Sequence, residues 1–178
     1  MTELTTSNAP SRVFIAVRGP ICAGKSSVID ELETYWPDTV SRVDIDVFKH
    51  QIDKTRSTEW RRDIALKSAC FLVDELMDID RTIISDIHSS RPEQYDAYAH
   101  LARANSYPFY SFLLYPPLQV CLARNKERII PQVSYKISDL AIEQYWRDTY
   151  HIPGEEVFDT SVQEPSEIAA TIFDKVTR

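Results

Sequence analysis

The segment from Gly19 to Ser26 has the residue types and the spacing of a phosphate-binding loop. It reads GPICAGKS and fits the pattern G-x-x-x-x-G-K-[ST]. Glycines at the two fixed positions let the backbone curl so that consecutive N–H groups point inward and surround an anion. The loop precedes an expected helix, whose N-terminal N–H groups and dipole favour negative charge. We therefore expect this loop to bind the phosphates of a nucleoside triphosphate.

The same residues are expected to hold ATP or GTP together with Mg²⁺. Lys25 would reach the β- and γ-phosphates, and the Ser26 hydroxyl would ligate Mg²⁺. The chain has only 3 glycines, against roughly 12 at an average usage of about 7%, and two of them occupy the fixed positions of the loop. The expected nucleotide contacts are Gly19, Pro20, Ile21, Cys22, Ala23, Gly24, Lys25, Ser26 and Ser27.

Three carboxylates at the ends of expected strands are candidates for phosphoryl-transfer chemistry. Asp44 and Asp46 lie in the segment VDIDVFK, and on a strand over residues 40–46 they would point to the same side. One could accept the proton of an attacking hydroxyl while the other holds Mg²⁺ or the substrate; the alternative is a solvated pair at a strand end. Asp86 ends the next strand, where it could hold Mg²⁺ through water or bind acceptor hydroxyls. Its alternative is a helix cap or turn.

Basic side chains in two later segments extend this set of candidates. His88 and Arg91 follow Asp86 in the sequence DIHSSR and are candidates for an acceptor pocket, although a histidine in a loop is commonly just solvated. Arg124 and Arg128 are four residues apart and share one face of an expected helix. Because guanidinium groups stabilise bidentately the charge that phosphoryl transfer spreads over oxygens, both are candidate catalytic residues. The alternative is a solvated helix face.

Two clusters combine aromatic and basic residues and have two interpretations each. Trp60-Arg61-Arg62 begins a long expected helix, and Tyr145-Trp146-Arg147 lies in a later one. Either cluster could stack on or pair with an acceptor. Aromatic residues at helical spacing are more commonly part of the core, so core packing is the alternative for both.

Hydrophobic periodicity alternates between strands and helices along the chain. Short apolar, β-branched runs predict strands at residues 13–17, 40–46, 82–86, 109–115 and 156–159. Helical spacing predicts helices at residues 26–35, 59–78, 92–105, 116–128, 140–150 and 164–175. Such alternation predicts a three-layer α/β fold, a five-stranded parallel sheet with helices on both faces. We expect residues 1–12 to form a flexible tail and residues 13–178 a single domain.

The amino-acid composition limits the class of protein and the cellular compartment that we expect for this chain. The 178 residues carry a formal net charge of −7, which disfavours a broad nucleic-acid surface without excluding a local basic groove. Cys22, Cys70 and Cys121 are widely spaced, which predicts neither a disulfide framework nor a zinc site and fits a reducing cytosol. No apolar run approaches the roughly 18 residues of a membrane span. We therefore expect a cytoplasmic protein that does not bind membranes.

In these segments the chain resembles the zeta-toxin and chloramphenicol-phosphotransferase group of P-loop kinases, and polynucleotide 5′-kinases are similar. The phosphate loop and VDIDVFK match closely, and the order of elements matches over most of the chain. In that group the general base is an aspartate after the second strand. Aligned on Phe48-Lys49, the resemblance implies that the base here is Asp46, with Asp44 as the second choice. The resemblance also implies a small lid carrying arginines, here at about residues 124–138.

The function expected from these features is an ATP- and Mg²⁺-dependent kinase that transfers the γ-phosphoryl group to a hydroxyl of a small-molecule acceptor, with Asp46 as general base. One alternative is a polynucleotide 5′-hydroxyl kinase, for which Arg61, Arg62, Lys67 and Arg147 would line a nucleic-acid groove. Another is a non-catalytic nucleotide-binding regulatory module. A homodimer is a common arrangement for domains of this size, whereas the sequence does not identify the acceptor.

Overall fold

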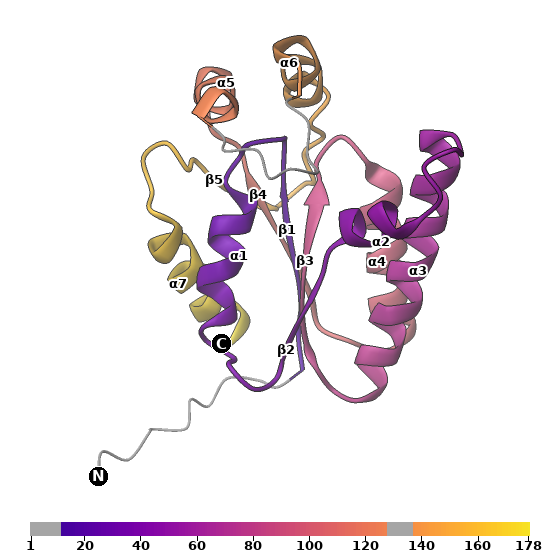
Figure 1. The fold of residues 1–178 in the computed structure, drawn as a ribbon. Coiled ribbons are helices and arrows are strands. Elements are labelled where there is room, and N and C mark those ends of the chain that lie inside the picture. Colours follow the sequence, from indigo (N-terminus) through magenta and orange to yellow (C-terminus); the bar gives the residue numbers. More distant parts are fainter. Residues whose placement is uncertain (1–11, 128–136) are drawn as a thin grey trace.

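A five-stranded sheet lies between two layers of helices in the computed structural model, which describes residues 12–127 and 137–178 (Figure 1). The strands are β1 (Phe14–Gly19), β2 (Val40–Val43), β3 (Thr82–His88), β4 (Phe109–Leu114) and β5 (Glu156–Phe158). Their order in the sheet is β2-β3-β1-β4-β5, and all neighbouring pairs are parallel. The predicted three-layer α/β fold is therefore confirmed.

The helices of the described residues cover both faces of the sheet and the carboxyl ends of its strands. They are α1 (Lys25–Glu33), α2 (Ile45–Gln51), α3 (Thr58–Asp78), α4 (Pro92–Ala104), α5 (Leu118–Glu127), α6 (Asp139–Arg147) and α7 (Pro165–Val176). Helices α1 and α7 pack on one face and α3 and α4 on the other, while α5 and α6 lie beyond the strand ends at the top of Figure 1. None of the helices in the described ranges is long and apolar enough to span a membrane.

The central strand β1 contributes to two separate hydrophobic cores because its side chains alternate between the two faces. Ile15 and Val17 pack with α1 and α7, whereas Phe14 and Ala16 pack with α3 and α4. Every residue of β1 is buried, as is typical of a parallel strand covered on both faces. This burial explains the uninterrupted apolar run in the sequence. Strand β1 also fixes the start of the phosphate loop at the edge of the sheet.

The segment around Asp44 differs from the predicted strand over residues 40–46. Strand β2 ends at Val43, and Asp44 is the N-cap of α2, with its Oδ1 accepting a hydrogen bond from the Asp46 backbone N–H at 2.8 Å. Aspartate is among the preferred N-cap residues, so the chain turns into a helix at this point. The expectation that Asp44 and Asp46 alternate along one strand is wrong; they belong to a helix cap and the first turn after it.

Strand β3 also differs, because it continues beyond Asp86 to His88. Its last residue pairs with Gly19 at the end of β1, and the Ser89 N–H donates to the Gly19 carbonyl at 3.3 Å. Asp86 and His88 are two residues apart on one strand, so their side chains leave the same face of the sheet. The extension places both side chains beside the start of the phosphate loop.

Candidate nucleotide and phosphoryl-transfer site

The predicted phosphate loop connects the end of β1 to the start of α1. Cys22 and Gly24 both have left-handed backbone conformations, with φ of 63° and 94°, and together they curl the loop ahead of the helix. Gly19 is required for a different reason: a Cβ at this position would lie 2.7 Å from the backbone oxygen of Leu114 on β4. The loop thus presents N–H groups at the N-terminus of a helix, which is an arrangement that binds phosphate.

The Lys25 side chain folds back over the phosphate loop. Its Nζ donates hydrogen bonds to the backbone oxygens of Gly19 at 3.1 Å and Pro20 at 3.0 Å. Ser26 and Ser27 follow on the first turn of α1 and are exposed to solvent. The ammonium group and the Ser26 hydroxyl therefore lie at the mouth of the nest, where the phosphates and the metal ion of a nucleotide would bind.

Two residues from the other end of the chain brace the loop. The Thr160 hydroxyl donates to the Ala23 carbonyl at 2.8 Å and accepts from Nη1 of Arg124, also at 2.8 Å. Nη2 of Arg124 donates to the Thr160 carbonyl at 2.7 Å, and Nη1 lies 3.4 Å from the Cys22 carbonyl oxygen. Sequence reasoning placed Arg124 at the site but missed Thr160, whose only signal is its position directly after the short last strand.

A buried ion pair lies directly beneath the loop. Arg18, the residue before Gly19, pairs with Glu155, and their side chains are 0% and 2% exposed. Nη2 of Arg18 donates to the Tyr150 carbonyl at 2.9 Å, the guanidinium lies 4.1 Å from the centre of the Tyr150 ring, and Ser111 donates to Glu155. These contacts fasten the segment between α6 and β5 to the strand that leads into the loop.

The three candidate carboxylates lie together in front of Lys25, although not in the predicted way. Asp86 is mostly buried; burial raises the pKa of its carboxyl group, the charge of Lys25 opposes that rise, and Asp44 and Asp46 add to it. Asp46 is solvent-exposed and forms an ion pair with Lys49 at 2.6 Å. Burial acts to raise its pKa, but the hydrogen bond and charge of Lys49 dominate and lower it. Asp46 is therefore a carboxylate at neutral pH.

His88 lies between these acids and helix α6. Its Nδ1 is 3.0 Å from the Ser90 hydroxyl, and its ring meets the Tyr145 ring edge-on with 4.7 Å between centres. Its Nε2 is buried and has no hydrogen-bond partner among the described residues. Burial, with the charges of Lys25 and Arg91 adding to it, lowers the pKa of His88 to about 3, so the imidazole is neutral.

The two aromatic and basic clusters have different outcomes. Trp146 stacks on Tyr115 with 4.8 Å between ring centres and donates to the Pro116 carbonyl at 2.9 Å, and Arg147 pairs with Glu143 at the surface. Of that cluster only Tyr145 faces the site. In the first cluster, Arg61 donates to the Lys49 carbonyl at 2.8 Å and thereby joins α3 to α2.

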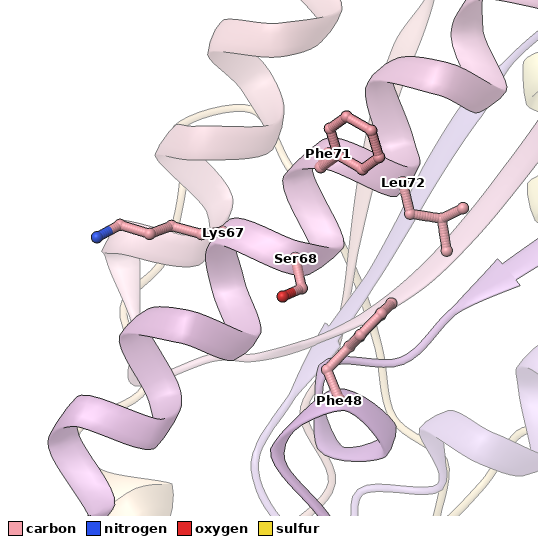
Figure 2. Close-up of a pocket in the computed structure, with 5 residues that line it drawn as sticks. All are labelled: Phe48, Lys67, Ser68, Phe71 and Leu72. Carbon is pink, nitrogen blue, oxygen red and sulfur yellow. The ribbon is translucent and has the colours of Figure 1, made fainter. Parts of the chain in front are cut away.

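A hollow between α2 and α3 is lined by no residue of the phosphate loop. Figure 2 shows Phe48 of α2 directed toward α3, where Ser68, Phe71 and Leu72 line the hollow and the Lys67 amine extends away from it. Phe71 and Leu72 are exposed. Phe48, the residue on which the kinase resemblance is aligned, thus packs α2 against α3 and fixes the helix that carries Asp46.

The structure gathers most of the predicted site residues at the carboxyl edge of the sheet. Asp86 interacts electrostatically with Lys25, Asp44 and Asp46, and His88 interacts with Lys25 and Asp46. Arg91 is the N-cap of α4 beside His88, and Arg124 contacts the loop from α5. Arg128 and most of the expected lid at residues 124–138 lie outside the described residues.

A sequence profile described as an AAA domain (AAA_33) matches residues 14–145, a range that includes the phosphate loop and the three carboxylates. The chain belongs to the AAA_33 family. A comparison with functionally curated proteins finds no match. Family membership, together with the fold, agrees with the resemblance to P-loop kinases that the sequence predicts.

Solved structures share the fold of this AAA_33 domain at low sequence identity. The tunicamycin resistance protein of Deinococcus radiodurans is 14% identical, with a TM-score of 0.70 over 93% of this chain and 95% of that one. The APS kinase CysC of Mycobacterium tuberculosis, in complex with AMPPNP and APS, is 17% identical, with a TM-score of 0.67 over 93% and 97%. A chain of the Pnkp1/Rnl/Hen1 RNA repair complex is 19% identical, with a TM-score of 0.64 over 83% of this chain but 46% of that one. At these identities the likeness establishes a P-loop kinase fold.

Proposed function

We propose that this AAA_33 domain is an ATP- and Mg²⁺-dependent kinase that phosphorylates a hydroxyl group of a small-molecule acceptor. One observation carries the proposal: a phosphate nest with its lysine faces a group of three carboxylates, Asp44, Asp46 and Asp86, across the same edge of the sheet. A protein that only binds a nucleotide needs the nest. The acids opposite it are suited to activating and orienting a second substrate. The neighbouring folds that bind AMPPNP and APS, or carry the name kinase, agree with this proposal.

In the proposed step, the acceptor oxygen forms a bond to the γ-phosphorus while the bond from that phosphorus to the β,γ-bridging oxygen breaks. ADP leaves with the electron pair of the broken bond, and the hydroxyl proton passes to the Asp46 carboxylate. Asp46 suits this role because it lies at the start of α2, where it is exposed and ionised, and because an ion pair with Lys49 orients its carboxylate. Positioning and electrostatic stabilisation supply most of the acceleration in such reactions.

The loop and its braces position the nucleotide. Lys25 would exchange its hydrogen bonds with the Gly19 and Pro20 carbonyls for the β- and γ-phosphates. Arg124 has its donors on Thr160 and Cys22, so we assign it the role of a positioning residue that keeps the loop in shape. Arg128, which lies outside the described residues, would stabilise charge on the transferred group.

The residues at the edge of the sheet fit Mg²⁺. The ion favours oxygen ligands and usually keeps several waters, with only one or two carboxylates and the substrate phosphates completing its coordination. Ser26 offers an exposed hydroxyl and Asp86 a carboxylate on which the charges of Asp44 and Asp46 act, while among the described residues no group of three or more His, Cys, Asp or Glu side chains forms a site by itself. Bound there, Mg²⁺ would neutralise charge on the β- and γ-phosphates.

The acceptor would bind between α2, α3 and the turn after β3. Asp44 and Asp86 would orient its hydroxyl groups, and His88 would contribute a neutral imidazole. Arg91 lies at the start of α4 next to that histidine. These assignments leave the hollow of Figure 2 outside the reaction, because none of the residues that line it belongs to the phosphate loop or to the three carboxylates.

A screen with γ-labelled ATP, Mg²⁺ and a library of hydroxyl compounds and 5′-hydroxyl oligonucleotides tests the proposal. We expect label transfer to a small molecule, a loss of about 10²- to 10⁴-fold in Asp46→Asn, and ADP affinity in that variant unchanged to within about threefold, because Asp46 does not contact the nest. Asp44→Asn is measured in parallel, and Asp63→Asn is the matched control, since Asp63 is an exposed carboxylate of α3 that pairs with Lys67.

Each other outcome has its own meaning. Near-normal turnover by Asp46→Asn overturns the assignment of the base, and loss confined to Asp44→Asn transfers that role to Asp44. Transfer to oligonucleotides alone, with steep salt dependence, identifies a polynucleotide kinase. ATP turnover that no acceptor changes, with a partner bound only in the ATP state, identifies a regulatory module.

A further inference from the structure

Arginines on two different elements face the carboxyl edge of the sheet beside His88. The inward face of α3 repeats every four residues, as Ala65, Ala69, Val73 and Met77 are all buried. Arg61 and Arg62 precede Ala65 by four and three residues, so they continue this face by one turn. That turn lies at the level of the strand ends, at the top of α3 in Figure 1. Arg91 reaches the same edge from the start of α4.

Two of these arginines, Arg62 and Arg91, lack the side-chain partner that the other half-buried cations of the described residues have. Within residues 12–127 and 137–178, Lys49 pairs with Asp46, whereas Lys25, Arg61, Arg81 and Arg124 donate hydrogen bonds to backbone carbonyls. Neither Arg62 nor Arg91, both half-buried, forms an ion pair or a side-chain hydrogen bond in those ranges. The chain has 27 acidic residues against 20 lysines and arginines, so acids are not scarce. Partly desolvated guanidiniums without a counter-ion are costly, and a bound anion would offset that cost.

His88 connects the two arginines to the reaction site. The Arg91 backbone N–H donates to the His88 carbonyl at 3.0 Å, and the charges of Arg91 and Arg62 both act on the imidazole. Its Nε2 is buried and lacks a partner. Arg61 is already committed, because it donates to the Lys49 carbonyl. The free hydrogen-bond donors around His88 are therefore those of Arg62 and Arg91. The acid whose charge acts on His88 is Asp46, the proposed base.

We propose that the acceptor carries an oxyanion group, a phosphate, sulfate or carboxylate, which Arg62 and Arg91 bind while its hydroxyl faces Asp46. This inference rests on the proposed kinase function and names its substrate class: alcohols that are already negatively charged. Guanidinium groups present planar, forked donors that match such oxyanions bidentately. His88 would add a hydrogen bond donated by Nε2, which is buried and has no partner among the described residues.

Matched acceptor pairs test the substrate class. Each pair contains a neutral alcohol and a charged counterpart, such as glycerol with glycerate, adenosine with adenosine 5′-monophosphate, and glucose with glucose 6-phosphate. We expect wild-type kcat/KM to favour the charged member of the accepted pair by at least tenfold. Arg62→Gln and Arg91→Gln should abolish that preference, and Arg62→Lys should restore part of it, because lysine keeps the charge without the fork.

Arg103→Gln is the matched control, since Arg103 is an exposed arginine in the last turn of α4. It should leave the preference intact, and thermal melting shows whether each variant is folded. Efficient transfer to neutral members, with no gain for the charged ones, overturns the inference while the kinase assignment stands. Equal loss in Arg103→Gln also overturns it.

A binding measurement separates failure of this inference from failure of the proposed function. Inorganic sulfate is titrated into the protein saturated with ADP and Mg²⁺, so that the phosphate loop is occupied. Arg62→Gln and Arg91→Gln should each weaken sulfate binding at least fivefold relative to Arg103→Gln. If no acceptor is phosphorylated, the kinase proposal fails, and this comparison alone decides whether the two arginines form an anion site. Equal sulfate affinity in all four proteins overturns it.

Discussion

Replacing each of the three glycines by alanine separates steric contact from backbone strain. At Gly154 φ is +80° and a new Cβ meets nothing within 4 Å, so only left-handed strain of about 1–2 kcal/mol applies, partly offset by a less flexible unfolded chain. At Gly24 φ is +94° and the nearest atoms, on Arg124 and Thr160, lie at 3.5 and 3.6 Å, which is ordinary contact. The expected loss of stability is therefore about 1 kcal/mol at both positions.

Gly19→Ala acts through a clash instead. Its Cβ would lie 2.7 Å from the Leu114 backbone oxygen and 3.1 Å from the Ala23 Cβ, and β1 and β4 are paired along their length, so a backbone must move. Overpacking of this kind costs about 1–3 kcal/mol. We expect the upper part of that range, because a backbone carbonyl in a paired strand yields less than a side chain does.

Urea unfolding and calorimetric ADP binding measure the two effects. Gly19→Ala should lose the most stability, and Gly19→Ala and Gly24→Ala should both weaken ADP binding by more than about tenfold, or 1.4 kcal/mol, because they distort the nest. Gly154→Ala should keep wild-type affinity. Equal stability of Gly19→Ala and Gly154→Ala would refute the steric reasoning, and wild-type ADP affinity in Gly24→Ala would refute the nest.

Three further predictions concern residues around the loop. In the folded protein His88 stays neutral, with a pKa of about 3, whereas in the unfolded chain it binds a proton near pH 6.5. The metal-free protein should therefore lose up to about 2 kcal/mol of unfolding free energy as the pH falls from 7 to 5. Urea titrations of His88→Gln should lack that part of the loss. Arg18→Met leaves Glu155 buried without a cation, so denaturation should show a loss of about 3–5 kcal/mol, most of it recovered in Arg18→Met/Glu155→Leu; no recovery would contradict the ion-pair account. Thr160→Val removes the hydroxyl between Ala23 and Arg124, and calorimetry should show about tenfold weaker ADP binding for a stability change of about 1 kcal/mol; unaltered affinity would mean that the brace is dispensable.

The phosphate loop could be predicted from sequence because its requirements are local. A strand, two glycines, a lysine and a serine within eight positions specify both the shape and the charge of the nest. The parallel sheet was equally accessible, since Val13 to Val17 form an apolar run bounded by polar residues. Local pattern and tertiary structure agree in these segments, and the prediction succeeds for that reason.

The acids were harder to place because Asp44 has two competing uses. Alternation in VDIDV favoured a longer strand, whereas the capping hydrogen bond from Asp44 to the Asp46 N–H starts a helix. The sequence alone does not give the relative stability of these two local structures, the longer strand and the capped helix. The same limitation applies to Trp146, where packing on Tyr115 outweighed a place in the site.

The braces could not be predicted because their partners are distant in sequence. Arg18 gives a faint signal, as a charged residue directly after an apolar run, but nothing in the sequence connects it to Glu155. Thr160 lies in an ordinary turn, and its importance comes only from the Ala23 carbonyl beside it. Contacts of this kind depend on the finished topology.

The same long-range contacts have a consequence for synthesis of the protein. The pairs Arg18–Glu155 and Ala23–Thr160 are each separated by 137 positions, so a growing chain emerges from the ribosome with its phosphate-binding motif long before the residues that hold the motif in shape. Closing such long loops is entropically slow. Nascent chains arrested before Glu155 should therefore fail to retain ADP, and nucleotide capture should begin only when the last strand has emerged. Nucleotide binding would then report that the five-stranded sheet is complete.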